Sequence, residues 1–275
     1  MSQISLTASM RSNLLSLQKT SALMSQTQER LATGKKVNSA IDNPGAYYTA
    51  QSLSNRANDL SSLLDNMGQA ISTIKAADEG IEAITSYVEQ AKAVATSALD
   101  TSDATARGKY QAQFNEIRNQ IDKLADDAKY KGINLLKGDS LTVTFDEGRN
   151  NQLVISGVNA TTGGELAIAK AETWNTGEAD AQKTAIETSI TAVTNAITKL
   201  RNMSSDFGNN YAIVETRENF TTNLINVLEE GADKLTLADM NEESANMLAL
   251  QTRQQLAINS LSLASQAAQS VLKLF

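Results

Sequence analysis

Apolar and small residues recur at alternating steps of three and four at both ends of this chain, and this spacing constrains its fold more than any other feature. In the closing stretch, residues 246–275, no Pro or Gly interrupts the pattern. Such spacing is the heptad seam of a helix that packs lengthwise against another helix. The seam positions are Met247, Leu250, Gln254, Ala257, Leu261, Ala264, Ala268, Val271 and Phe275. The chain stops on an uncapped apolar residue, so we expect this helix to be covered by a partner.

The opening stretch, residues 1–33, carries a matching seam. Its positions are Thr7, Met10, Leu14, Leu17, Ser21, Met24, Gln28 and Leu31. Because both stretches have few charges on their outer faces, we expect the two helices to pair with each other. Two ordinary amphipathic helices lying on one globular core remain the alternative.

Turn residues divide the chain between these seams. Gly34 follows the first helix at a position suited to a positive φ, and Asn43 with Pro44 is typical of an N-cap and a first helical position. From about 45 to 98 apolar residues hold one helical face. Residues 100–103, Asp-Thr-Ser-Asp, offer a turn and a new N-cap, so we expect a shorter helix to run back antiparallel.

The middle of the chain changes character. Apolar residues alternate with Thr over 141–145, a turn-rich stretch follows at 146–151, and alternation returns at 153–155. This pattern predicts a β-hairpin near 140–157. The next stretch is loop-like and contains the only Trp, Trp174, which we place at an outer tip or side.

Helical spacing resumes at Ile186 and continues to Leu228. Gly231 allows a break, and Asp239 or Asn241 can cap the closing helix. The expected fold class is mainly α: an elongated antiparallel, coiled-coil-like helical bundle with a small β-hairpin and with its N- and C-terminal helices paired.

We expect two domains. Residues 1–42 and 236–275 would form a terminal coiled-coil domain. Residues 43–235 would form a long-helix domain that includes the hairpin.

The absence of two residue types excludes several kinds of functional site. The 275 residues include no Cys and no His, which removes disulfides, thiolate chemistry, Cys-based zinc sites and every His-containing triad. The net charge of −7 argues against nucleic acid or an anionic membrane as a partner, because phosphate binding needs a basic face. No stretch is apolar for long enough to span a membrane. We therefore expect no enzyme, no cofactor and no metal site.

Neighbouring carboxylates occur at Asp126–Asp127, Glu229–Glu230 and Glu242–Glu243. Adjacent residues on a helix do not face each other, so such pairs are poor chelating or catalytic groups. We expect them to lie on solvated faces.

Two stretches carry a family likeness. One is LATGKKVNSAIDNPGAYYTAQSLSNRANDL, residues 31–60, with its Leu-x-Thr-Gly and Asn-Ser-Ala segments. The other is LADMNEESANMLALQTRQQLAINSLSLASQAAQSVLKLF, residues 237–275, with its Gln-Gln-Leu-Ala cluster and closing Val-Leu-x-Leu. Both resemble the bacterial flagellins, the subunits of the flagellar filament.

The resemblance implies a structural subunit that self-polymerises into the filament for motility. In flagellins the terminal helices form the inner core of the filament and fold on assembly, and long helices with a hairpin form the outer tube. Little chain separates the two helical halves here, which implies a short form without large outer domains. The candidate self-assembly residues are Met10, Leu14, Leu17, Met24, Leu31, Met247, Leu250, Leu261, Val271 and Phe275.

Conformational entropy also favours terminal helices that fold on assembly. Ordering two long terminal helices costs more conformational entropy than their few large apolar side chains return on burial. Contacts from neighbouring subunits must supply the difference, so folding and assembly should be coupled.

The resemblance also implies partners and a location. The partners are identical subunits, the flagellar export machinery, a flagellin export chaperone, and the filament cap and hook-junction proteins. The location is the extracellular filament. The amino terminus lacks a basic segment followed by an apolar run and a cleavage site, so we expect export without a cleaved signal peptide.

Many flagellins are recognised by an innate immune receptor through an Arg followed by Arg-Glu-Leu-Ala on the first long helix. The matching stretch here is VEQAKAVATSA, with Gln90 at the first Arg position and Ala93 at the Glu position. Lys92 keeps a charge but lacks the planar fork of Arg. We expect weak recognition.

Flagellins often carry sugars on outer Ser or Thr residues. The candidates here are Thr161, Thr162, Thr173 and Thr176, although a Thr-rich loop is more often merely solvated.

Two other classes remain open. A hook–filament junction protein has similar terminal helices but usually carries a Pro-Ser-Asp-Asp-Pro-like turn, where this chain has residues 38–44, Asn-Ser-Ala-Ile-Asp-Asn-Pro. A non-flagellar coiled-coil binding module would be expected to end in a polar cap, which this chain lacks.

Overall fold

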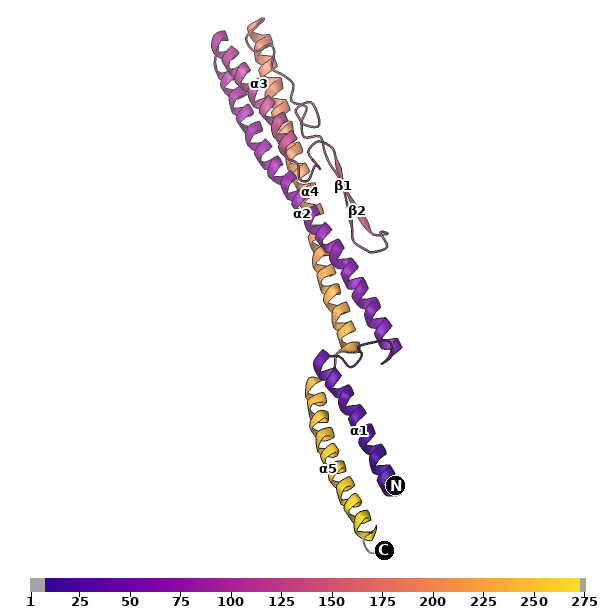
Figure 1. Ribbon diagram of the computed structural model, residues 1–275. Helices are drawn as coiled ribbons and strands as arrows, with labels where there is room; N and C mark the ends of the chain where they lie inside the picture. The colour runs from indigo at the N-terminus through magenta and orange to yellow at the C-terminus, as the bar shows by residue number, and fades with distance from the viewer. Residues whose placement is uncertain (1–7, 273–275) are drawn as a thin grey trace. The chain divides into compact units, whose positions relative to one another are not determined.

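The computed structural model describes residues 8–272 (Figure 1). Over this range the chain forms α1 (Ala8–Thr33), α2 (Pro44–Asp100), α3 (Ala104–Asp127), β1 (Ser140–Thr144), β2 (Gln152–Ser156), α4 (Ala179–Thr236) and α5 (Met240–Leu272). The expected mainly α fold with one small hairpin is confirmed.

The chain divides into two compact units. One unit comprises Met1–Asn55 and Val227–Phe275, and the other comprises Arg56–Asn226. Both divisions between the compact units fall inside the long helices α2 and α4.

In the unit Arg56–Asn226, segments of α2, α3 and α4 surround one apolar core (Figure 1). The buried positions of α2 alternate by three and four residues, as a heptad seam requires. They are Met67, Ala70, Ile74, Ala77, Ile81, Ile84, Val88, Ala91, Ala95 and Ala98. Phe114 and Ile121 of α3 and Ile186 of α4 pack into the same core, and each is completely buried.

The predicted ends of α2 and the predicted start of α3 are confirmed. The long helix predicted over 45–98 runs from Pro44 to Asp100. Asp103 caps α3, because its side chain accepts a hydrogen bond from the backbone N–H of Thr105.

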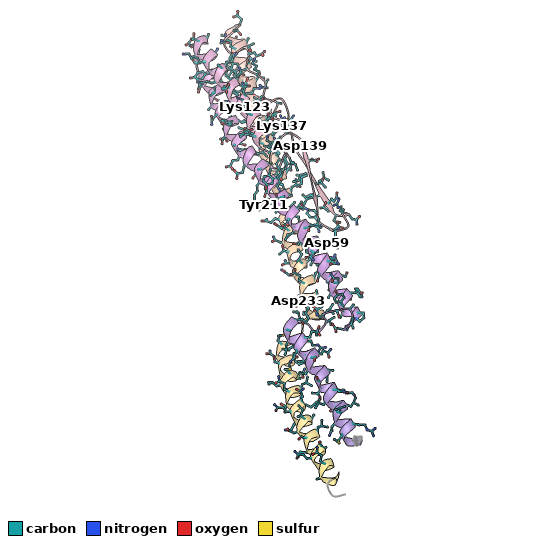
Figure 2. The ribbon with its side chains drawn as sticks, viewed as in Figure 1. Asp59, Lys123, Lys137, Asp139, Tyr211 and Asp233 are labelled. Atoms are coloured by element: carbon teal, nitrogen blue, oxygen red, sulfur yellow. The ribbon has the colours of Figure 1, made fainter. Side chains whose placement is uncertain are left out.

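The predicted hairpin is confirmed. β1 and β2 pair antiparallel, with Leu141 opposite Ile155 and Val143 opposite Leu153. Val143 and Ile155 are buried against the helices, whereas Val154 is 58% exposed. The turn that leads into β1 is held by Asp139, labelled in Figure 2, whose carboxylate accepts from the backbone N–H of Asn134 at 2.8 Å.

The position expected for Trp174 is wrong. Its stretch is irregular, as predicted, but the indole is only 1% exposed and lies 4.9 Å from the Phe114 ring, centroid to centroid. The same irregular segment, residues 157–178, also buries Leu166 and Ile168. The segment therefore covers α3 and completes the core instead of forming an outer tip.

Polar side chains of α3 hold the backbone of this segment. The Asn115 amide donates to the Ala171 carbonyl and accepts from the Ala171 N–H, both at 2.9 Å. Arg118 donates to the Ile168 carbonyl at 2.9 Å. Gln111 and Asp122 accept from the backbone N–H groups of Trp174 and Thr162. These bonds satisfy buried backbone groups that would otherwise be costly to take out of water.

Thr162 is therefore a poor candidate for glycosylation. Its side chain is 1% exposed, and its hydroxyl donates to the Asp122 carboxylate at 2.8 Å. Thr173 and Thr176 are exposed and remain candidates.

Candidate self-assembly interface

In the unit of Met1–Asn55 and Val227–Phe275, α1 and α5 pack along each other (Figure 1). The predicted pairing of the terminal helices is thus confirmed. On α5 the described residues of the predicted seam are all partly buried: Met247, Leu250, Gln254, Ala257, Leu261 and Ala264. The α5 helix therefore turns the predicted face toward α1.

The seam of α1 differs from the predicted one. Met10 is buried, and Leu17, Met24 and Leu31 are partly buried, as predicted. Between them, however, the inward positions are Asn13, Thr20 and Thr27 rather than Leu14, Ser21 and Gln28. Leu14 is 39% exposed.

Two seams fit the same spacing, which explains the error. Steps of three then four from Met10 lead to Asn13, and steps of four then three lead to Leu14. The hydrophobicity of Leu14 favoured the second choice. Thr20 can nevertheless sit at the interface, since its hydroxyl donates to the Ser16 carbonyl at 2.9 Å and so leaves no unpaired polar group.

An ion pair that the sequence pattern does not reveal joins the two helices. Arg30 Nη1 lies 2.8 Å from Glu243 Oε1, and the Glu243 side chain is only 9% exposed. The expectation that Glu242–Glu243 forms a solvated acidic face is therefore wrong for Glu243. No local signal marks this pair, because its partners are far apart in sequence.

Backbone pairing ties together the two linkers at the end of this helix pair. The Lys36 N–H donates to the Thr236 carbonyl at 2.8 Å, and the Ala238 N–H donates to the Gly34 carbonyl at 2.9 Å. Gly34 has a φ of 70°, the left-handed conformation expected after the first helix. The linkers are therefore an ordered junction rather than loose connections.

Two of the predicted helix caps lie near this junction. Asn43 accepts from the Ala46 N–H, so its predicted N-cap role is confirmed. Asp239 caps α5 by accepting from the N–H groups of Asn241 and Glu242. Asn241 lies inside α5, and Gly231 does not break α4, which continues to Thr236.

Large apolar side chains remain uncovered on both terminal helices. They are Leu14, Leu15 and Leu23 of α1 and Met240, Leu248, Leu256, Ile258 and Leu263 of α5, with exposed fractions of 39–67%. The α1–α5 pair buries one face of each helix and leaves a second apolar surface in solvent. Such a surface is typical of a site that binds another protein.

Two predicted assembly residues cannot be placed. Val271 lies in α5, but its side chain is outside the described residues, and so is all of Phe275. The other eight lie on the two terminal helices, Leu14 on the exposed face and the rest toward the seam.

Residues 8–272 show few features of other kinds of site. No described helix combines the length and hydropathy required to cross a membrane. No group of three or more acidic side chains gathers there in a metal-binding arrangement. On α2, Gln90 and Ala93 are exposed and Lys92 is partly exposed, so this stretch is open to a partner.

The chain is similar to known proteins over most of its length. The bacterial flagellin N-terminal helical region matches residues 4–140, and the bacterial flagellin C-terminal helical region matches residues 190–275. The chain is 33% identical over 263 residues to flagellin FljM of Caulobacter vibrioides, covering 95% of this chain and 94% of that protein. It is 30% identical over 271 residues to a flagellin of Brucella melitensis, covering 95% of each. A crystal structure of Bacillus cereus flagellin aligns with 57% of this chain and 88% of that chain, with a TM-score of 0.47 and 18% identity.

Proposed function

This chain belongs to the bacterial flagellin family, whose members polymerise into the extracellular flagellar filament, and we propose that its own polymerisation is driven by the apolar surface left open on α1 and α5. The chain is accordingly a structural subunit of the filament.

One observation supports this most directly: eight large apolar side chains in the described part of the terminal helices are 39–67% exposed in the single subunit. Full burial of a side chain of this size is worth roughly 1.5–3 kcal/mol, so covering the part that is still exposed would contribute about half of that for each residue. The α1–α5 seam itself includes polar residues, among them Asn13, Thr20 and Thr27, and so contributes less than an all-leucine seam. The helix pair therefore gains much of its stability only when further helices cover it.

Folding and assembly are thus coupled. The free subunit keeps its Arg56–Asn226 core, which contains the completely buried residues Met67, Phe114 and Ile186, and has marginal order in its terminal helices. Assembly supplies the contacts that make those helices stable. In the filament, residues 1–42 and 236–275 form the inner core, and residues 43–235 form the outer tube.

The same family membership supports a set of transient partners. The export machinery, an export chaperone, the filament cap and the hook-junction proteins would each handle the subunit before or during assembly. A chain without Cys suits passage in an unfolded state, since no disulfide can form on the way. Intact-mass measurement of secreted protein tests the export route, because a cleaved signal peptide would lower the mass.

The central experiment follows polymerisation and helicity together. Heat-dissociated protein is cooled at a series of concentrations, and far-UV circular dichroism is recorded beside negative-stain electron microscopy. The expected result is a gain of helical signal above the concentration at which filaments form. A helical signal that is already complete in dilute monomer would contradict coupled folding. The absence of filaments at every concentration would contradict the role in polymerisation.

A further inference from the structure

Ile41 is an apolar knob on a rigid turn. Its side chain is 93% exposed, the highest value among the exposed large apolar side chains described. The Asp42 carboxylate closes the turn by accepting from the N–H groups of Asn38 at 3.0 Å and Ser39 at 2.9 Å, and from the Ser39 hydroxyl at 3.2 Å. A turn fixed in this way loses little entropy when it binds a partner.

A negative charge, the Asp42 carboxylate, lies next to Ile41 in the sequence. The backbone N–H groups of Ser39 and Asn38 lower the pKa of Asp42, so its carboxylate is ionised at neutral pH. All three donors bind Oδ2, and no described residue donates to Oδ1. The turn thus presents an exposed Ile next to a carboxylate oxygen that can accept another hydrogen bond.

A groove with the complementary character lies in the unit Arg56–Asn226, between α2, the turn at 130–133 and β1. Its volume is about 340 Å³. The apolar part of its lining comprises Leu63, Ala70, Ile133, Leu141 and Val143. The groove is large enough to take an isoleucine side chain together with the residues beside it, and its apolar lining matches that side chain.

Two cations, Lys131 and Arg149, also line this groove. Neither forms an ion pair with any described carboxylate. Both have a positive φ, 47° and 57°, a conformation that is uncommon for residues other than Gly and is found more often at functional sites. The groove therefore offers unpaired positive charge beside an apolar floor.

A second groove is less suitable. It has a volume of about 190 Å³ and is lined by Ile74, Phe207 and Tyr211 together with Lys75 and Asp78. Lys75 already lies over the Tyr211 ring, 5.4 Å from its centroid, and Asp78 would repel Asp42. The charges of this groove do not complement the Ile41–Asp42 turn.

We propose that the Ile41–Asp42 turn of one subunit docks in the groove between α2 and β1 of a second copy, with Ile41 on the apolar floor and Asp42 facing Lys131 and Arg149. This inference rests on the proposed function as a filament subunit. Because knob and groove are different surfaces of the same chain, the contact is heterologous. Contacts of this type generate open helical polymers when the rotation between copies does not close a ring.

Disulfide trapping tests the contact directly, since the chain has no Cys of its own. Ile41→Cys protein is mixed with Thr142→Cys protein, polymerised and oxidised; Thr142 is an exposed residue of the groove. The expected product is a disulfide-linked pair of unlike chains, because docking brings the two Cα atoms within about 7 Å. Asn119→Cys, on an exposed face of α3, is the control and should not be trapped. Filaments in which Ile41→Cys links to neither partner, or equally to both, would overturn the inference and leave the proposed function standing.

The critical concentration for filament formation provides an independent test. Ile41→Asp should raise the critical concentration for filament formation about tenfold or more, because it removes the buried apolar group and adds a charge beside Asp42. Arg149→Glu should shift it in the same direction. Thr49→Asp, at another exposed position near the start of α2, is the matched control and should polymerise like the natural chain. If Ile41→Asp polymerises at the natural concentration, the inference fails. If the natural chain itself forms no filaments, the proposed function fails with it.

Discussion

Arg30 and Glu243 lie 213 positions apart in the sequence, yet Arg30 Nη1 and Glu243 Oε1 are 2.8 Å apart. Arg30 is in the last turn of α1, and Glu243 is in the first turn of α5. Each charge therefore also opposes the partial charge of its own helix end. Sliding one helix along the other would separate these two charges. The ion pair therefore fixes the register of α1 and α5, whereas heptad spacing alone would allow several registers.

Removing one partner of this pair should destabilise the filament. Glu243→Ala leaves the Arg30 guanidinium partly buried without its counter-charge, at a cost of about 1–3 kcal/mol, toward the low end because the Arg30 side chain is 33% exposed. Thermal dissociation of filaments, followed by light scattering, should occur at a lower temperature. Glu242→Ala is the control, since Glu242 is its exposed neighbour. Equal dissociation temperatures for the two variants would show that the pair contributes nothing to register.

The open apolar face of α5 should matter for assembly and not for the monomer. Leu256 is 62% exposed, so Leu256→Ser should leave the circular dichroism of the monomer unchanged. The critical concentration should rise roughly five- to thirtyfold, because covering the exposed part of Leu256 contributes about 1–2 kcal/mol. The adjacent exposed residue provides the comparison, and Gln255→Ser should have little effect. A Leu256→Ser chain that polymerises normally would mean that neighbours do not cover this face.

Deleting residues 241–275 should separate folding of the core from assembly. The truncated chain lacks nearly all of α5 but keeps the unit Arg56–Asn226 intact. We expect a partly helical monomer that remains in solution and forms no filaments. Sedimentation and electron microscopy provide the measurement, and normal filaments from this truncation would refute the assembly role of α5.

Trp174 should report the docking of the segment 157–178 on α3. It is the only Trp in the chain and is 1% exposed, so its fluorescence should shift to longer wavelength when this segment opens. Phe114→Ala, which removes the ring 4.9 Å away, should lower the free energy of unfolding by about 3–5 kcal/mol in a urea titration. Thr173→Ala, at the exposed residue beside the indole, should change it by less than about 0.5 kcal/mol. An unshifted midpoint for Phe114→Ala would show that the aromatic pair does not stabilise the unit.

We expect weak recognition by the innate immune receptor, because α2 lacks the Arg and Glu of the family motif. Gln90 and Ala93 are both exposed, so Gln90→Arg with Ala93→Glu should restore receptor activation without disturbing the core. A receptor reporter assay with purified monomer compares the double variant with the natural chain. Full activation by the natural chain would show that these two positions do not limit recognition.

The terminal helices show how far heptad spacing carries a prediction. On α5 the seam from Met247 to Ala264 is the one that the sequence predicts. On α1 the spacing leaves a choice between Leu14 and Asn13, and hydrophobicity selects the wrong one. The partner helix decides which face is covered, and information about the partner lies more than 200 residues away along the chain.

For the irregular segment, residues 157–178, the sequence predicts the local structure but not the burial. Loop-like composition correctly predicts that residues 157–178 lack regular structure. It does not predict that Gln111, Asn115, Arg118 and Asp122 would hold the backbone of this segment against α3. These side chains recur at helical spacing, but an exposed polar face has the same appearance in a sequence.

The sequence by itself determined the helices, the hairpin, most of the caps and the pairing of the two ends, because heptad spacing, strand alternation and turn chemistry act over a few residues. Only the tertiary structure decided that Trp174 is in the core, that Glu243 is buried beside Arg30, and that Ile41 stands free beside an ionised Asp42. Burial and charge pairing depend on residues distant in sequence, and the energy of a side chain depends on what surrounds it after folding.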